Sequence, residues 1–224
     1  MSAPMPWSVQ RSARRSLRIV APLLLVAGLA AQQTQLTDGQ LKAAAMEVPE
    51  LVTLFELKPG MTVADVGAGF GAWTMEFAKA VGPSGRVYAS DIGAAQLAAL
   101  REAAKKHSNV TVVEGAATST NLPAGCCDAI LVRDAYHHLT EPEPIVKSLA
   151  AALKPGGRLA VIDFPPRENS QVPTGVPTNR RGHGVPPDVV EREVGAVLTH
   201  VRTNPTWASN SQPSDLFLVL FKKP

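Results

Sequence analysis

The segment 63–71 combines an apolar stretch with three glycines at alternate positions, Gly67, Gly69 and Gly71, and a helical pattern follows it. Glycine has no Cβ, so the backbone at these positions can approach a bound molecule closely. The first turn of the following helix offers N–H groups that lack partners within the helix. A strand, a glycine-rich turn and a helix in this order predict a site for a nucleotide-like ligand.

The glycine spacing alone does not choose between nucleotide-like ligands. Dinucleotide sites use Gly-x-Gly-x-x-Gly, in which the third glycine comes one position later than Gly71. That position holds Ala72, which a variant of the motif accepts. An NAD(P)-dependent oxidoreductase therefore stays open as an alternative.

Two carboxylates favour a ligand with a positive charge. Asp65 comes two residues before Gly67, where it would repel a pyrophosphate and attract an ammonium group. Asp91 comes twenty residues after Gly71, at the end of the next apolar run, where a carboxylate can accept both hydroxyls of a ribose. A ribose joined to a cationic amino-acid end describes S-adenosylmethionine (SAM), which we therefore expect as the cofactor.

Alternating apolar segments must position these residues. Strand patterns occupy residues 61–66, 87–90, 110–113, 129–132 and 158–163, and helical patterns occupy 38–57, 73–81, 94–106 and 143–153. A last helix at 187–198 precedes strands at 200–206 and 216–221, which suggest a closing antiparallel hairpin. We therefore predict an α/β fold, Rossmann-like, with a seven-stranded and mostly parallel sheet covered by helices on both faces.

The chain resembles the class I SAM-dependent methyltransferases, of the small-molecule, type-11-like kind, from about Glu47 to its C-terminus. Residues 65–71 match the glycine motif of that family, Asp91 matches its ribose acid, 127–134 its fourth-strand segment and 153–157 its Leu-Lys-Pro-Gly-Gly turn. The resemblance implies in-line transfer of a methyl group from SAM to a small-molecule acceptor. An exported SAM-binding module without activity stays open as a second alternative.

The resemblance also implies a set of cofactor-binding residues. They are Asp65, Gly67, Ala68, Gly69, Gly71, Asp91, Ile92, Gly115, Ala116, Ala117 and Arg133. Many relatives carry an acid after the third strand that bonds the adenine amino group, whereas this chain has Ala116 and Ala117 there. We therefore expect backbone groups near these alanines, with apolar contact from Ile92, to hold the adenine; Thr118 is a substitute partner.

Four residues that follow the fourth strand, Asp134, Tyr136, His137 and His138, are the candidates for the methyl-transfer step. A neutral imidazole can take a proton from an oxygen or carbon acceptor, whereas a thiol or amine needs no base. Each histidine can equally be a packed residue, and Asp134 and Tyr136 can be a helix cap and a core aromatic. Adjacent side chains usually point in different directions, so we expect no metal site from this histidine pair.

Residues 165–187 interrupt the alternation, because nine of these 23 residues are proline or glycine. We expect a long loop at the carboxyl end of a strand, acting as a lid or substrate wall. His183 lies in it between two glycines and can either reach the substrate or face solvent. The chain has two cysteines, Cys126 and Cys127, so a framework of several disulfides is excluded. Adjacent cysteines rarely bridge without backbone strain.

The first 31 residues differ in composition from the rest. Four arginines lie among the first 18 residues, and without them the formal charge falls from +3 to −1. A basic start followed by the apolar run 19–31, short of the ~20 residues that span a bilayer, is typical of a secretory signal peptide. We expect residues 1–31 to be a signal peptide or membrane anchor and residues 32–224 to be the methyltransferase domain.

This arrangement predicts an exported, periplasmic protein; a membrane-anchored or cytoplasmic protein is the alternative. The near-neutral body gives no reason to expect nucleic acid as a partner, and we expect no membrane contact after signal cleavage. The expected partner is the small-molecule methyl acceptor. The oligomeric state does not follow from the sequence.

Overall fold

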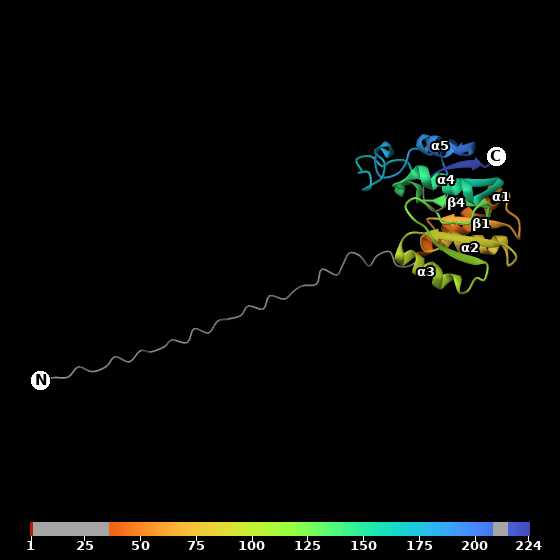
Figure 1. The fold of residues 1–224 in the computed structure, drawn as a ribbon, viewed down its shortest axis with the longest axis horizontal. Helices are drawn as coiled ribbons and strands as arrows, with labels where there is room; N and C mark the ends of the chain where they lie inside the picture. The colour runs from red at the N-terminus through yellow and green to blue at the C-terminus, as the bar shows by residue number, and fades with distance from the viewer. Residues whose placement is uncertain (2–35, 208–214) are drawn as a thin grey trace. The chain divides into compact units, whose positions relative to one another are not determined.

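The computed structural model describes residue 1 and residues 36–207 and 215–224 (Figure 1). Contacts divide the chain into two units, residues 1–33 and 34–224, and the fold described below is that of the second unit. Apart from Met1, the expected signal segment 1–31 lies outside the described residues. Within the described part, no helix is both long enough and apolar enough to cross a membrane.

Strands and helices alternate along the described chain. The strands are β1 (Thr62–Val66), β2 (Arg86–Asp91), β3 (Val110–Glu114), β4 (Cys127–Arg133), β5 (Leu153–Asp163), β6 (Thr199–Asn204) and β7 (Phe217–Lys222). The α-helices are α1 (Asp38–Phe55), α2 (Ala72–Val81), α3 (Ala94–Ala104), α4 (Pro142–Ala152) and α5 (Pro187–Gly195), and two 3-10 turns span Tyr136–His138 and Thr178–Arg180.

The strands form one seven-stranded sheet in the order β3-β2-β1-β4-β5-β7-β6. Strands β1 to β5 pair in parallel, whereas β7 pairs antiparallel with both β5 and β6. The predicted Rossmann-like α/β fold with an antiparallel C-terminal pair is therefore confirmed. The carboxyl ends of β1, β2 and β4 meet at one edge, which is where ligands bind in open α/β sheets.

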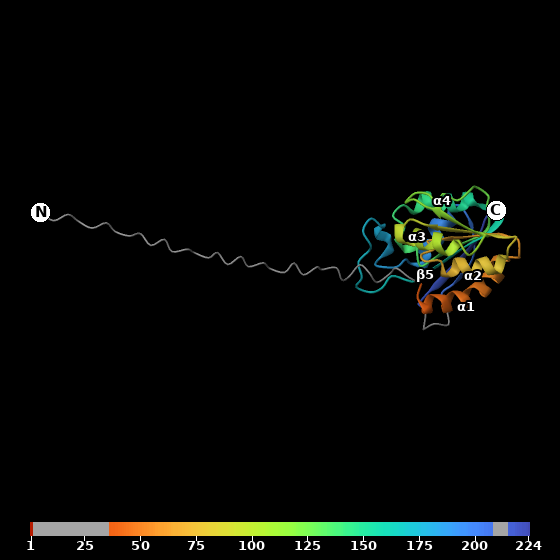
Figure 2. The same ribbon diagram turned by 90° about the horizontal axis from the view of Figure 1, so that it is seen from below.

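Successive residues of the central strands face opposite sides of the sheet. Val63 of β1 and Leu131 of β4 pack on the side of α1 and α2, whereas Ala64 and Ile130 pack on the side of α4 and α5. Figure 2 shows α1 and α2 on one side of the sheet and α4 on the other. Burial on both faces explains why these strands are continuous apolar runs in the sequence.

A local signal sets the start of α1, whereas pairing sets the start of β5. Thr37 caps α1 through its hydroxyl, and Gln40 completes the capping box. Strand β5 begins at Leu153, earlier than predicted, because this residue pairs with Cys127 ahead of an irregularity in the β4–β5 register. Adjacent cysteines rarely bridge, and this structure joins Cys126 and Cys127 in such a disulfide.

The long loop 165–187 follows β5, as predicted. Its central side chain is Arg180, which is fully buried and bonds both carboxylate oxygens of Glu193 on α5 at 2.8 and 3.0 Å. The backbone N–H of Val185 donates to the carbonyl of Phe164 at 3.0 Å. The first contact ties the loop to α5, and the second joins the end of the loop to the residue that precedes its start.

Candidate active site

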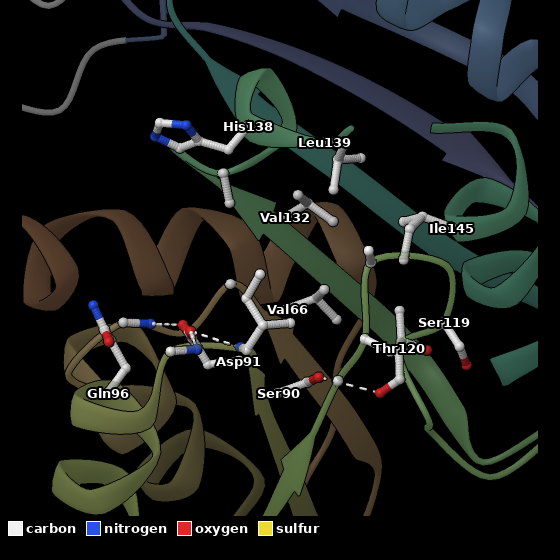
Figure 3. A pocket seen from close by; sticks show the side chains of 18 of the residues that line it. Val66, Ser90, Asp91, Gln96, Ser119, Thr120, Val132, His138, Leu139 and Ile145 are labelled. Carbon is white, nitrogen blue, oxygen red and sulfur yellow. Dashed lines mark hydrogen bonds between the residues drawn. The ribbon is translucent and has the colours of Figure 1, made fainter. Parts of the chain in front are cut away.

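A cavity of about 440 Å³ opens at the carboxyl ends of β1, β2 and β4 (Figure 3). Its volume lies in the range of about 300–1,000 Å³ that is usual for small-molecule sites. Among the predicted site residues, the cavity is lined by Gly67, Gly69, Asp91, Ile92, Gly115, Ala116, Ala117, Asp134 and His138. The other predicted residues, Asp65, Ala68, Gly71, Arg133, Tyr136 and His137, do not line it.

The glycine turn between β1 and α2 is shaped by positive φ angles. Gly67 has φ +73°, and a Cβ there would lie 2.5 Å from the Cβ of Ala135. Gly69 has φ +55°, and a Cβ there would meet no atom within 4 Å. The space next to Gly69 therefore lets a ligand lie directly against the backbone.

Asp91 organises the neighbouring wall of the cavity. One carboxylate oxygen accepts the N–H of Gly69 at 2.9 Å, and the other accepts the N–H groups of Ile92 and Gly93 at 2.8 and 2.9 Å. These bonds join the end of β2 to the glycine turn. The carboxylate also faces the cavity, as the predicted ribose contact requires.

Asp65 lies behind the glycine turn rather than on the cavity wall. Its side chain is buried, and the hydroxyl of Thr74 on α2 donates to it at 2.6 Å. Burial is the main cause that raises the pKa of Asp65 to about 6, with Asp91 adding to the rise while the Thr74 bond opposes it. Near neutral pH Asp65 is a buried negative charge beside the glycine turn.

Arg133, a predicted cofactor residue, is bonded to a residue that the sequence did not single out. Its guanidinium donates to both oxygens of the buried Glu47 at 2.8 and 2.9 Å and stacks at 3.8 Å on the ring of Trp73. The indole N–H of Trp73 donates to the same carboxylate at 3.0 Å. Glu47 thus ties α1 to α2 and to the end of β4.

The predicted adenine end of the cavity has Ile92, Gly115, Ala116 and Ala117 on its wall. The N–H of Ala116 already donates to the carbonyl of Ser119 at 2.7 Å. Of the two expected backbone donors, Ala117 is therefore the one better placed for the adenine. The substitute Thr118 is not a lining residue of this cavity.

The two adjacent histidines have different surroundings. His138 lines the cavity, and partial burial is the main cause that lowers its pKa, followed by its two histidine neighbours, so its imidazole is neutral at pH 7. His137 is buried; its Nδ1 lies 2.9 Å from one oxygen of Asp163, and its backbone N–H donates to the other at 3.0 Å. The sequence analysis missed Asp163, which is the last residue of β5.

Asp134 and Tyr136 also have different surroundings. Asp134 lies on the cavity wall with φ +53°, and loss of hydration together with the nearby Asp163 raises the pKa of its carboxyl. Tyr136 is fully buried, and its hydroxyl donates to Glu193 at 2.9 Å. Tyr136 therefore packs in the interior, which is one of the two roles expected, and does not line the cavity.

Several polar wall residues were not expected. They are Ser90, Gln96, Ser119, Thr120 and Thr140. Ser90 and Thr120 are joined at 3.2 Å through the hydroxyl of Ser90 and the carbonyl of Thr120 (Figure 3). The end of a β-strand was a usable signal for Ser90, which directly precedes Asp91. The remaining four lie on helix α3 or on loops, where no motif marks them.

Comparison with known proteins places this site in a family context. Residues 63–157 match the family described as "Methyltransferase domain", and the match covers the glycine turn, Asp91 and the histidine pair. The described chain superposes with a TM-score of 0.65 on a SAM-dependent methyltransferase from Aquifex aeolicus, at 25% identity over 84% of this chain and 94% of that one. Residues 63–157 are thus similar to a methyltransferase domain, and the fold around them is similar to that of a SAM-dependent methyltransferase.

Curated proteins similar to this chain include the ubiquinone/menaquinone biosynthesis C-methyltransferases UbiE of Pasteurella multocida and Escherichia fergusonii. They are 32% and 33% identical to it over 111 residues, which is 48% of this chain and 41% and 44% of theirs. The chain thus spans less than half the length of these relatives. A second structural neighbour is a phosphoethanolamine N-methyltransferase of Haemonchus contortus in complex with SAM. Its TM-score is 0.60, at 15% identity over 79% of this chain and 52% of that one, so it shows a shared fold.

These findings bear on the alternatives that the sequence left open. The matched family and the two neighbouring structures named above are methyltransferases, and of the two structures one is named as SAM-dependent and the other is in complex with SAM. These similarities favour SAM over the nicotinamide cofactor of the oxidoreductase alternative. The individual cofactor and catalytic residues stay predictions, and the positions reported above show which of them share one cavity. The lid function of the loop 165–187 also stays a prediction, since its residues do not line the cavity described here.

Proposed function

We propose that the protein transfers the methyl group of SAM to a small-molecule acceptor that binds at the His138 end of the cavity. The observation that carries this proposal is the single cavity that joins Gly69 and Asp91 to Asp134 and His138. Figure 3 shows Asp91 low in the pocket and the imidazole of His138 at its top. A cofactor held at Asp91 and an acceptor beside His138 would therefore share one cavity.

Two residues of the cavity wall and one buried behind it fit SAM. Gly69 leaves room for close approach to the backbone, Asp91 offers carboxylate oxygens to a ribose, and the buried charge of Asp65 favours an ammonium group nearby. When bound, SAM supplies a methyl group on a positively charged sulfur. The chain's own contribution is to align donor and acceptor and to exclude water, since an in-line displacement needs little covalent help.

We place the acceptor beside His138 because that side chain faces the cavity with a neutral imidazole at pH 7. A neutral imidazole can take a proton from a weakly acidic acceptor. The curated relatives are named as C-methyltransferases of ubiquinone and menaquinone biosynthesis, and a ring carbon becomes nucleophilic when a neighbouring hydroxyl loses its proton. A phenolic or quinol-type acceptor, methylated on carbon or oxygen, is therefore our proposed acceptor class.

The test is a turnover assay on the purified full chain with SAM. The acceptor panel contains phenols and quinols, with thiols and amines as comparison classes, and S-adenosylhomocysteine and the methylated product are measured. We expect product with a phenolic acceptor and none in the Asp91→Ala variant. If the protein binds S-adenosylhomocysteine but forms no product with any acceptor, the non-catalytic binding module becomes the better description.

We also propose that residues 1–31 direct export of the protein. The support is the order of basic residues, an apolar run and small residues in the sequence. Mass spectrometry of the protein from a periplasmic extract tests this, with a mature N-terminus near Ala30 or Ala31 as the expected result. A full-length N-terminus on protein found in the cytosol would contradict export.

A further inference from the structure

We propose that His137, His138 and His183 form a binding site for a divalent transition-metal ion of the zinc class, next to the acceptor end of the cavity. The three histidines come from two separate segments, the 3-10 turn after β4 and the long loop after β5. One ring nitrogen from each lies within 4.8 Å of the others. The sequence argument against a metal considered only the adjacent pair, and the fold adds the third histidine.

The rings are already gathered at short range. Ring centroids are 4.0 Å apart for His137 and His138, 5.0 Å for His137 and His183, and 5.8 Å for His138 and His183. Nitrogen ligands of a tetrahedral zinc ion lie about 3.3 Å apart, as Zn–N distances of about 2.0–2.1 Å require. Closing the remaining gap takes a shift of about 1.5 Å at most, which side-chain rotation can supply.

Asp163 gives His137 the orientation of a metal ligand. The carboxylate holds both the Nδ1 and the backbone N–H of His137, and it also accepts the N–H of Phe164 at 2.9 Å. With Nδ1 bonded to Asp163, the Nε2 atom is the one left to coordinate an ion. A carboxylate behind a ligating histidine is the usual outer partner in zinc sites. Because its oxygens are already engaged, we assign Asp163 this supporting role and not that of a ligand.

The backbone that carries His183 is fixed by its neighbours. The N–H of His183 donates to the hydroxyl of Ser170 at 2.8 Å, and its carbonyl accepts the N–H of Arg167 at 3.0 Å. Gly184 has φ +125°, and a Cβ there would lie 2.7 Å from the carbonyl oxygen of Pro165. The loop thus packs tightly against the end of β5, which holds His183 over the histidine pair.

Three imidazoles leave one position of a tetrahedral ion open, which is the arrangement of catalytic and not of structural zinc sites. His138 belongs both to this cluster and to the cavity wall, so the open position adjoins the proposed acceptor. This inference therefore deepens the proposed function. A bound ion would polarise an acceptor hydroxyl or thiol, and His138 would then be a ligand instead of a base.

The test is metal binding by the full chain, expressed without a polyhistidine tag and freed of metal with a chelator. Zn²⁺ is titrated by calorimetry, and Co²⁺ by visible absorption. We expect one ion per chain and the intense visible bands of four-coordinate cobalt. Asp163→Asn should weaken Zn²⁺ binding about 10–100-fold, and His183→Ala should weaken it further. The matched control is His200→Ala, since His200 lies on β6 and bonds Thr203 at 2.9 Å.

Two results would overturn the site. One is equal zinc affinity in His183→Ala and in the unmodified chain, which would mean an adventitious ion only. The other is that the unmodified chain binds no more zinc than the variants do. Binding of S-adenosylhomocysteine is measured on the same samples, because His183 does not line the cofactor cavity. Unchanged cofactor binding shows that the variant is folded, and it separates failure of the metal site from failure of the proposed function.

Discussion

The substitution Asp65→Asn should stabilise the free protein and weaken its cofactor binding at the same time. Asparagine keeps an oxygen that can accept the Thr74 hydroxyl but removes the buried charge. The pKa of Asp65 rises from 3.8 in a model peptide to about 6 in the fold, mainly because of burial. At 1.36 kcal/mol per unit, this shift corresponds to about 3 kcal/mol of destabilisation when the carboxylate is ionised.

The sign of the pH dependence follows from the raised pKa. The folded state binds this proton more tightly than the unfolded state, so the contribution of Asp65 to stability is full below about pH 4 and is lost as the pH rises through about 6. Asp65→Asn should therefore match the unmodified chain at pH 4. At pH 8 its free energy of unfolding should be higher by up to about 3 kcal/mol.

Urea unfolding at both pH values measures the first effect, and calorimetry with S-adenosylhomocysteine measures the second. Loss of the charged partner should lower affinity for the ligand about tenfold or more at pH 8. In the unmodified chain, affinity for S-adenosylhomocysteine should fall below pH 6, because Asp65 becomes protonated there. In Asp65→Asn this fall should be absent. The control is Glu50→Gln, an exposed acid on α1. Equal affinity in both chains at pH 8 would refute the role of Asp65 as the partner of a cationic ligand.

Three further substitutions test the fold around the site. Asp91→Asn should weaken S-adenosylhomocysteine binding about 10–100-fold in calorimetry, because the amide cannot accept all three backbone N–H bonds. Unchanged affinity would contradict the assignment of Asp91 to the ribose. Gly67→Ala should lower the free energy of unfolding by about 2 kcal/mol or more. Adding Ala135→Gly should recover the part of this loss that comes from the 2.5 Å contact between the two Cβ atoms. No recovery in the double variant would mean that the positive φ of Gly67 is the whole cause. Arg180→Met should lower the free energy of unfolding by about 3–5 kcal/mol, because Glu193 loses its buried partner. A loss below about 1 kcal/mol in urea unfolding would show that the pair is not needed for stability.

The parts of the fold that sequence analysis predicted are those with local signals. Apolar runs such as 61–66 and 129–132 are buried on both faces of the sheet, so their continuity along the chain marked them as strands. The glycine turn was equally visible, because positive φ at Gly67 and Gly69 restricts those positions to glycine. Asp91 followed from its place at the end of the second strand.

The remaining site residues depend on contacts between segments far apart in the chain. Glu47 and Arg133 are 86 positions apart, and Asp163 and His137 are 26 apart, so no spacing rule connects them. The burial of Tyr136 against Glu193 and the approach of His183 to the histidine pair depend on how the loop 165–187 packs. That packing is a tertiary effect that composition does not reveal.

Calorimetric titration of the full-length protein with S-adenosylhomocysteine, with NADH titrated into a second sample, tests the central claim most directly. Gly69 and Asp91 line the cavity and Asp65 is buried behind it, and we propose that they bind a ribose with a cationic tail. We therefore expect one S-adenosylhomocysteine per chain and no heat of binding from NADH. Saturable binding of NADH without binding of S-adenosylhomocysteine would contradict the assignment of this cavity to SAM.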